Sequence, residues 1–267
     1  MTTYGLIGYP LSHSFSKKYF SEKFEKQHIS NTVYELFELQ SITEFPKLVR
    51  ETTNLKGLNV TIPYKQQIIS YLDELDGVAV RIGAVNVIKV MPDKKLKGYN
   101  SDYYGFKQSL INFLLINNIT HQVVNNVAIY TEKAIILGNG GAAQAVKVAL
   151  EDLGIAYQVV SQKANTNETD SKITNKISYE NLASNIELFE KYQIIINTTP
   201  LGMYPNIDAM PQIPYQLLTE KHLIFDLVYN PPQTLLMQKA TKQGAKVQNG
   251  LEMLYLQAEK AWEIWNT

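Results

Sequence analysis

The sequence predicts an α/β fold in which mostly parallel sheets carry helices on their faces. Short apolar runs typical of buried strands alternate with segments whose apolar residues have helical spacing. A polar stretch interrupts this alternation near the middle of the chain, after which the series restarts. Because 267 residues are enough for two domains of ordinary size, we expect two α/β domains that face each other across a cleft.

The first part of the chain supplies strands over residues 4–7, 33–36, 58–62 and 84–90. Helices are expected over residues 17–27, 45–49 and 66–72, and a longer one over residues 103–115. In the first of these helices Tyr19, Phe20 and Phe24 have the spacing of one helix face. The polar stretch over residues 117–131 is interpreted as a surface excursion or linker.

The second part of the chain repeats the alternation. Strands are expected over residues 134–137, 157–160, 194–196 and 223–227, and helices over residues 142–153, 234–243 and 251–265. The segment 162–176 is rich in Asn, Thr, Lys and Ser, which predicts a mobile loop. The natural division falls near Asp102 and Gly250. We therefore expect one domain over residues 1–102, completed by a C-terminal helix over residues 251–267, and a second over residues 103–250.

Composition excludes several classes of protein. The 25 basic and 25 acidic residues balance, whereas nucleic-acid binders usually carry a basic excess. The absence of cysteine excludes disulfides, thiol nucleophiles and cysteine-ligated metals. None of the four histidines has ligand spacing, so we expect no metal. No signal peptide and no apolar run of about 18 residues is present, which predicts a cytoplasmic protein without a membrane partner.

A glycine-rich turn follows the expected strand 134–137 and opens the next helix. It reads Gly138-Asn139-Gly140-Gly141-Ala142-Ala143, which fits G-x-G-x-x-A. The first glycine permits the turn, the second lets the backbone approach a pyrophosphate, and Ala143 lets the helix pack closely on the strand. Backbone N–H groups and the positive helix end then hold the phosphates. The alternative is a turn that needs glycine for its conformation alone.

The end of the next strand normally contacts the adenosine ribose of a dinucleotide. Here it reads Val160-Ser161-Gln162-Lys163, without the acidic residue that holds a free ribose 2′-hydroxyl in a typical NAD site. Ser161 and Lys163 are candidates to receive a 2′-phosphate, which favours NADP over NAD. The alternative for Lys163 is a solvated loop lysine.

Polar residues follow the strands of the first domain. Ser14 and Ser16 are placed on one side of an extended segment, where paired hydroxyls suit a small anion such as a carboxylate. The alternative is that one of these serines caps the helix starting near Lys17. Lys65 is either functional or a solvated first-turn lysine. Asp102 is either functional or the N-cap of the following helix.

Seven segments, in order and at suitable spacing, resemble the shikimate dehydrogenase family, and they cover nearly the whole chain. They are Gly8-Tyr-Pro-Leu-Ser-His13-Ser14-Phe-Ser16, Asn59-Val-Thr61-Ile-Pro-Tyr-Lys65, Gly83-Ala-Val-Asn86, Asn100-Ser-Asp102-Tyr-Tyr-Gly105, Asn197-Thr198-Thr-Pro-Leu-Gly-Met203, Asp226-Leu-Val-Tyr229-Asn-Pro231 and Gly250-Leu-Glu-Met-Leu254 with Gln257. The sequence departs from the family at Lys17, where Pro is usual, and at Gln162, where NADP-dependent members often place Arg. His13 is interpreted as structural.

The resemblance implies a substrate domain, a Rossmann-type nucleotide-binding domain and a C-terminal helix that returns to the first domain. It implies NADP-dependent interconversion of 3-dehydroshikimate and shikimate in chorismate and aromatic amino-acid biosynthesis. Lys65 and Asp102 would be the catalytic pair. Residues implied to bind substrate are Ser14, Ser16, Thr61, Asn86, Asp102, Tyr229 and Gln257. Residues implied to bind cofactor are Gly138, Asn139, Gly140, Gly141, Ala142, Ser161, Lys163, Thr198, Met203 and Gly250.

The pattern leaves three alternatives of function. The first is an NAD-preferring quinate/shikimate dehydrogenase, which the lack of an acidic residue near Ser161 disfavours. The second is a non-catalytic shikimate-binding protein on the same scaffold, which loss of Lys65 or Asp102 would have indicated. The third is a more distant enzyme related to the folate dehydrogenases that also use a lysine, which the serine and Gln257 motifs do not support. A monomer and a homodimer both fit the sequence.

Overall fold

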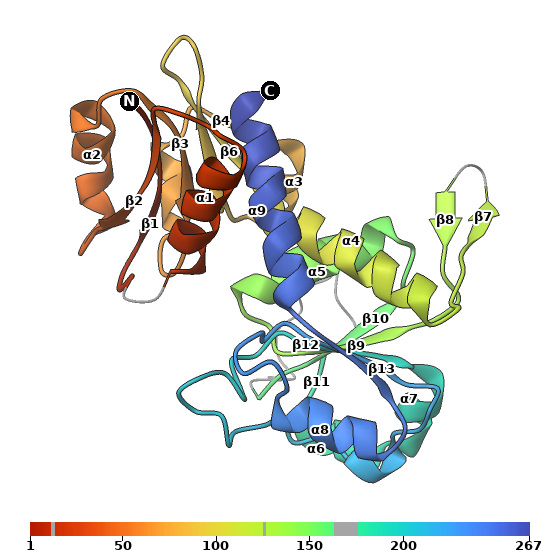
Figure 1. Ribbon diagram of the computed structural model, residues 1–267. Helices are drawn as coiled ribbons and strands as arrows, with labels where there is room; N and C mark the ends of the chain where they lie inside the picture. Colours follow the sequence, from red (N-terminus) through yellow and green to blue (C-terminus); the bar gives the residue numbers. More distant parts are fainter. Residues whose placement is uncertain (12–13, 125–126, 163–175) are drawn as a thin grey trace. The chain divides into compact units, whose positions relative to one another are not determined.

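A computed structural model describes residues 1–11, 14–124, 127–162 and 176–267 (Figure 1). The predictions for His13 and Lys163 lie outside these residues. The chain divides into two compact units, which we call unit 1 (Met1–Tyr104 with Gln257–Thr267) and unit 2 (Gly105–Leu256). The boundaries between the units fall inside α4 (Ser101–Ile116) and α9 (Leu251–Asn266). The predicted domain limits at residues 102 and 250 stay predictions.

Unit 1 is built on a mixed sheet with strand order β2-β1-β3-β5-β6-β4. β1 is parallel to both β2 and β3, whereas β5 runs antiparallel to β3 and β6. The strands are β1 (Thr2–Gly8), β2 (Thr32–Glu38), β3 (Leu55–Val60), β4 (Glu74–Leu75), β5 (Val87–Val90) and β6 (Leu96–Tyr99). The helical elements are α1 (Phe15–Lys26), η1 (Ile42–Glu44), α2 (Phe45–Glu51), η2 (Gln67–Tyr71) and α3 (Gly77–Ile82).

Alternating side chains of unit 1 supply two apolar cores. On β1, Tyr4 and Leu6 join one core with α1 and α9, whereas Ile7 joins another with α2. The last turn of α9 is fixed on the sheet because Trp265 Nε1 donates to the Ile88 carbonyl oxygen at 3.0 Å. Gly57 on β3 makes room for this indole, since a Cβ atom there would lie 2.2 Å from its ring. The C-terminal helix is thereby fastened to the N-terminal sheet.

Helix α1 begins two residues earlier than the apolar spacing predicts. Ser14 is its N-cap and accepts a hydrogen bond from the Lys17 N–H at 3.3 Å. Ser16 consequently lies inside the first helical turn, so the expectation that both serines share an extended segment is wrong. The capping alternative for one serine is confirmed for Ser14, and its physical basis is that a hydroxyl satisfies an unpaired N–H of the first turn.

Unit 2 is built on a parallel sheet with strand order β11-β10-β9-β12-β13-β14. The strands are β9 (Ala134–Leu137), β10 (Tyr157–Val160), β11 (Lys176–Ile177), β12 (Ile194–Asn197), β13 (Leu223–Asp226) and β14 (Lys246–Asn249). The helical elements are α5 (Gly141–Asp152), α6 (Tyr179–Ser184), α7 (Ile186–Lys191), η3 (Tyr215–Leu217) and α8 (Leu235–Lys242). Strands β9, β12 and β13 are buried along their whole length, as expected of a sheet covered on both faces.

The stretch predicted as a surface excursion or linker contains an antiparallel ribbon. Its strands are β7 (Gln122–Val124) and β8 (Val127–Ile129), which lie side by side in Figure 1. Short strands of three residues give too little periodicity to be detected from sequence. In the described part of the chain, every helix falls short of the length and apolar character that crossing a membrane would require.

Candidate functional site

In unit 1 the catalytic candidates Lys65 and Asp102 form an ion pair. The Lys65 Nζ lies 2.7 Å from Asp102 Oδ2, and the two side chains are 33% and 13% exposed. Asp102 is not the N-cap of α4. Asn100 fills that position, because its Oδ1 accepts from the Tyr103 N–H at 3.2 Å while its Nδ2 donates to the Ala84 carbonyl oxygen. The Asp102 carboxylate is therefore available to the lysine.

The backbone around Lys65 is held by neighbouring elements of unit 1. The Lys65 carbonyl oxygen accepts from the Val85 N–H at 2.7 Å, and the Thr61 N–H donates to the Ile7 carbonyl oxygen at 2.9 Å. Tyr64, which is buried, donates from its hydroxyl to the Leu39 carbonyl oxygen at 2.6 Å. The turn between Thr61 and Lys65 is thus fixed at the carboxyl end of β3, beside the end of β1.

Asn86 is a buried junction between three elements. Its Nδ2 donates to Gln257 Oε1 on α9 at 3.2 Å, and its Oδ1 accepts from the Ser101 N–H at the start of α4 at 2.6 Å. Its backbone carbonyl oxygen accepts from the Val60 N–H at the end of β3. The structure therefore brings together Asn86, Gln257 and the start of the helix that carries Asp102, although they lie far apart in the sequence.

Ser16 is held against β2 by a tyrosine. The Tyr34 hydroxyl, which is buried, hydrogen-bonds Ser16 and donates to Asn59 Oδ1 at 2.7 Å. Burial raises the pKa of Tyr34 above its ordinary value, and the hydrogen bond with Ser16 opposes that shift only partly. Tyr34 stays protonated and links Ser16 to Asn59, which in turn donates to the Asn86 carbonyl oxygen.

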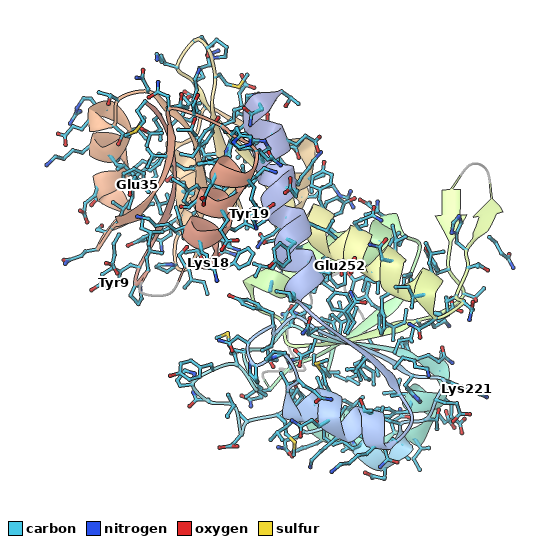
Figure 2. All side chains as sticks on the ribbon, in the orientation of Figure 1. Tyr9, Lys18, Tyr19, Glu35, Lys221 and Glu252 are labelled. Carbon is cyan, nitrogen blue, oxygen red and sulfur yellow. The ribbon has the colours of Figure 1, made fainter. Side chains whose placement is uncertain are left out.

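Helix α1 is tied to α9 by a polar cluster that the sequence analysis missed. Lys23 is buried and its Nζ lies 2.7 Å from Glu259 Oε2. The hydroxyl of Tyr19, which is labelled in Figure 2, donates to the same carboxylate. Lys23 also lies 5.9 Å over the Trp262 ring. Burial alone would raise the pKa of Glu259. The hydrogen bonds from Lys23 and from the Tyr19 hydroxyl, together with the positive charge of Lys23, outweigh burial and lower this pKa overall. The sequence contains one sign of this cluster, because Lys23 lies between Phe20 and Phe24 of the apolar helix face.

In unit 2 the glycine-rich turn has the geometry of a phosphate cradle. Gly138 follows β9 with φ of +102°, and a Cβ atom there would lie 2.8 Å from Thr198 Oγ1. Gly140 is the N-cap of α5 without a side-chain hydrogen bond, and space is open around the Cβ positions of Gly140 and Gly141. Ala143 is fully buried. The residues present therefore fit a dinucleotide, whose phosphates the first N–H groups of α5 would hold.

A cavity of about 680 Å³ lies at the carboxyl ends of the unit 2 strands. It is lined by Gly138, Asn139, Ser161, Gln162, Lys176 and Tyr179, among others. The structure thus brings the glycine turn and the end of β10 to one cavity, as expected of a ligand site in an open α/β sheet. Lys176 ends the segment 162–176 that the sequence predicts to be a loop, but in the structure it begins β11 and lines this cavity.

Helix α5 carries a buried lysine beneath the turn. Lys147 is 5% exposed, and its Nζ donates to Asn139 Oδ1 in the turn. Burial lowers the pKa of Lys147, and the charge of Lys176 lowers it further, while Glu151 opposes both. The second residue of the turn is thereby fixed by a cation that the sequence pattern did not reveal.

The loops after β12 and β13 are organised by a fully buried carboxylate. Asp226 accepts from Asn197 Nδ2 at 2.9 Å, from the Thr234 hydroxyl at 2.6 Å and from the Val228 N–H at 3.1 Å. Burial raises the pKa of Asp226, and these three donors counteract part of that rise. The network fixes the starts of the two loops that carry the predicted residues Thr198, Met203 and Tyr229.

Three predicted cofactor residues and one predicted substrate residue lie after strands β12, β13 and β14 of unit 2. Thr198 donates from its hydroxyl to the Leu137 carbonyl oxygen at 2.8 Å, so this hydroxyl supports the end of β9. Gly250 leaves no room for a Cβ atom, which would lie 2.1 Å from the Leu227 carbonyl oxygen. Met203 and Tyr229 are exposed, at 45% and 37%. The functional roles of these four residues stay predictions.

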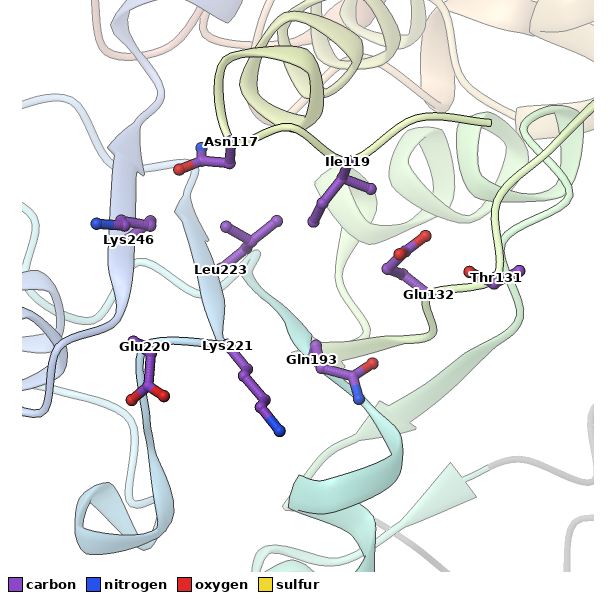
Figure 3. Close-up of a pocket in the computed structure, with 9 residues that line it drawn as sticks. All are labelled: Asn117, Ile119, Thr131, Glu132, Gln193, Glu220, Lys221, Leu223 and Lys246. Carbon is purple, nitrogen blue, oxygen red and sulfur yellow. The ribbon is translucent and has the colours of Figure 1, made fainter. Parts of the chain in front are cut away.

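A second cavity of unit 2 lies at the amino ends of the strands (Figure 3). It is lined by Glu132, Gln193, Lys221 and Lys246, among others, and the side chains of Lys221 and Lys246 point away from Glu132. Within the described residues, Glu132 Oε2 is a buried side-chain oxygen without a hydrogen-bond partner. Across the described ranges, no group of three or more His, Cys, Asp or Glu side chains is placed to hold a metal ion.

The parallel sheet of unit 2, with its glycine turn and cavity, defines a dinucleotide-binding α/β protein. The family model described as the shikimate dehydrogenase substrate binding domain matches residues 6–88. The shikimate dehydrogenase (NADP(+)) of Clostridium beijerinckii is 40% identical over 268 residues, which cover 99% of this chain and 92% of that protein. The chain belongs to the shikimate dehydrogenase family.

Solved structures agree with this assignment. A chorismate mutase/shikimate 5-dehydrogenase fusion protein from Clostridium acetobutylicum is 35% identical with a TM-score of 0.84, covering 100% of this chain and 91% of that chain. Shikimate 5-dehydrogenase from Listeria monocytogenes, in complex with shikimate and NAD, is 28% identical with a TM-score of 0.83. That match covers 100% of this chain and 92% of the other.

Proposed function

We propose that the protein catalyses the reversible, NADPH-dependent reduction of 3-dehydroshikimate to shikimate, a step of chorismate and aromatic amino-acid biosynthesis. Membership of the family supports the reaction. The observation that carries the proposal for this chain is the 2.7 Å ion pair between Lys65 and Asp102 at the carboxyl end of β3. Such a pair at the end of a strand suits acid–base chemistry on a small bound ligand.

Lys65 is proposed to be the proton donor and acceptor. NADPH supplies the hydride when it is bound. As negative charge grows on the ketone oxygen, the Lys65 ammonium would stabilise that charge and transfer a proton to the oxygen; in the reverse direction Lys65 would remove the proton from the hydroxyl. Asp102 would orient the ammonium and accept a hydrogen bond from a neighbouring ring hydroxyl.

The substrate carboxylate is proposed to bind at the start of α1. Ser14 and Ser16 stand at this helix terminus, where hydroxyls and backbone N–H groups favour an anion. Capping by Ser14 is compatible with this role, because a hydroxyl that accepts from Lys17 N–H can still donate its own proton. Tyr229 of unit 2 is proposed as a further carboxylate contact.

The ring hydroxyls of the substrate are proposed to contact Thr61, Asn86, Asp102 and Gln257. Asn86 and Gln257 are already hydrogen-bonded to each other, so their orientation is set before a ligand arrives. A site with such fixed polar groups rejects analogues that lack a hydroxyl, since the buried partners would be left unpaired.

The cofactor is proposed to bind along the unit 2 cavity. The turn of Gly138, Asn139, Gly140, Gly141 and Ala142 would hold the pyrophosphate, and Thr198, Met203 and Gly250 would line the nicotinamide side. Ser161 would contact the adenosine ribose, where the lack of an acidic side chain among the described lining residues disfavours NAD. A metal is not required for this chemistry.

None of the three rival functions has an observation of its own. The Lys65–Asp102 pair speaks against a non-catalytic shikimate-binding protein, and the neutral Ser161 and Gln162 speak against an NAD-preferring quinate/shikimate dehydrogenase. The cytoplasmic location and the choice between monomer and homodimer stay predictions.

The direct test follows the absorbance of reduced nicotinamide when purified protein is mixed with shikimate and either NADP or NAD. We expect rapid reduction of NADP and slower reduction of NAD. Reduction mainly of NAD would keep the reaction and overturn the cofactor assignment. Failure of folded protein to reduce either cofactor would overturn the proposed function.

A further inference from the structure

We propose that Lys176 forms the cationic subsite that selects the 2′-phosphate of NADP, in the place of the arginine that Gln162 does not provide. This inference rests on the proposed function and deepens its cofactor assignment. Its first support is the lining of the unit 2 cavity. Among the described residues around this cavity, Lys176 carries the only full charge, whereas Ser161, Gln162 and Tyr179 are neutral.

The strand register places Lys176 beside the end of β10. Val159 pairs with Lys176 and Val160 pairs with Ile177, and the Ser161 N–H donates to the Ile177 carbonyl oxygen at 3.1 Å. Val160 and Ile177 belong to the core that α6 and α8 cover. Because side chains alternate along a strand, Lys176 points to the face of the sheet opposite to Ile177 and Val160. By the same alternation Ser161, the residue after Val160, is on the face to which Lys176 points.

The opposite face of the sheet carries a second cation on α5. Lys147 lies there with its ammonium on Asn139, and the charge of Lys176 is near enough to contribute to the lowered pKa of Lys147, after burial. This electrostatic contribution indicates that the Lys176 ammonium lies on the α5 side of the sheet, which agrees with the strand register.

The position within the sheet indicates which phosphate the subsite would receive. The pyrophosphate is expected at the glycine turn after β9, whereas the adenosine ribose is expected at the end of β10. Lys176 lies on β11, which is one strand beyond β10 in the order β11-β10-β9. The charge therefore stands beside the ribose position and on the far side of it from the turn, as a 2′-phosphate requires.

The test compares binding of adenosine 2′,5′-bisphosphate and AMP, which differ only in the 2′-phosphate, by isothermal titration calorimetry. Wild type is expected to prefer the bisphosphate. Lys176→Gln should reduce that preference by about 10- to 100-fold, the effect of losing one charge-assisted hydrogen bond, with little change in AMP affinity. Lys221→Gln is the matched control, because it removes a lysine of the same unit from the cavity at the amino ends of the strands (Figure 3).

Two results would overturn the inference. One is a wild-type protein that binds both nucleotides equally, and the other is an unchanged preference in Lys176→Gln while the thermal unfolding midpoint matches wild type. Lys176→Glu provides a second variant, and we expect it to disfavour the bisphosphate more strongly than Lys176→Gln because like charges repel. The calorimetric test needs no shikimate. If the protein reduced neither cofactor, the proposed function would be overturned, whereas the preference for the bisphosphate could still be measured.

Discussion

The two units of the molecule offer different kinds of groups to the ligands that we propose for them. Unit 1 gathers side chains, among them Lys65 and Asp102 at 2.7 Å and Asn86 with Gln257 at 3.2 Å, at the ends of a mixed sheet. Unit 2 presents mainly backbone, through a glycine turn with open space at two Cβ positions, and adds charge from Lys176 and Lys147.

This difference follows from the ligands that we propose. A ring with one carboxylate and several hydroxyls is distinguished from its analogues by directed side-chain hydrogen bonds. A pyrophosphate is an anion that any helix N-terminus can hold, so backbone suffices there and selectivity moves to the adenosine end. Substitutions in unit 1 should therefore change catalysis, and substitutions in unit 2 should change cofactor affinity.

The largest expected effect is on turnover in unit 1. Lys65→Ala should lower kcat by about 10²- to 10⁴-fold with a much smaller change in shikimate affinity, because it removes the proposed proton donor, which would act in the transition state. Steady-state kinetics with shikimate and NADP measure both parameters. Lys56→Ala, an exposed lysine on the neighbouring β3, is the control and should behave as wild type. Retention of most activity by Lys65→Ala would remove Lys65 from its role.

The packing of α9 on unit 1 gives the next effect. Gly57→Ala should lower the free energy of unfolding by about 2–3 kcal/mol, because its Cβ atom would overlap the Trp265 ring. Urea unfolding measures the change. Gly77→Ala is the matched control, since nothing lies within 4 Å of a Cβ atom at Gly77. Equal stability of the two variants would contradict the close fit of Trp265 against β3.

Unit 2 should respond in cofactor binding. Lys147→Met removes the ammonium that holds Asn139, so we expect binding of both NADP and NAD to weaken by about 3- to 10-fold, the effect of one ordinary hydrogen bond. Fluorescence titration with the reduced cofactors measures it. An effect confined to NADP would assign Lys147 to the 2′-phosphate subsite and not to the turn.

The smallest expected effect concerns the link between α1 and α9. The folded-state pKa of Glu259 is lowered, so its charge stabilises the fold above its ordinary pKa and loses this effect as pH falls through the folded pKa. Glu259→Gln should cost about 1 kcal/mol at neutral pH, a value reduced for the half-exposed carboxylate. Urea unfolding from neutral to acidic pH should show the two proteins converging at low pH; a constant difference would contradict the ion-pair account.

Local patterns predicted the parts of this fold that depend on neighbours in sequence. The strands 134–137 and 157–160 have the predicted bounds, and α5 begins one residue before its expected start. The family assignment is confirmed, as are the α/β fold class and NADP as the cofactor. The strands β4 and β11 were missed because two residues carry no periodicity, and the four-residue strands β6 (Leu96–Tyr99) and β14 (Lys246–Asn249) were missed because neither is a continuous apolar run.

Features that depend on long-range contacts were beyond the sequence. Nothing near Lys23 in the chain indicates Glu259, and nothing near Ser161 indicates that Lys176 would line the same cavity. Asn100 was passed over as the cap of α4 in favour of Asp102, although both are good capping residues. Only the fold decides which of the two residues caps the helix and which is left to pair with Lys65.

The most direct test of the division of labour between the units is a double-mutant cycle in kcat/KM for NADP, with Lys65→Ala and Lys176→Gln. Lys176 is proposed to act only on cofactor affinity at the adenosine end, and Lys65 only on the reacting carbonyl. The account predicts that the double variant loses the product of the two single losses within about twofold, as independent sites do. A departure well beyond twofold would show that the two groups act on the same step and would contradict the account.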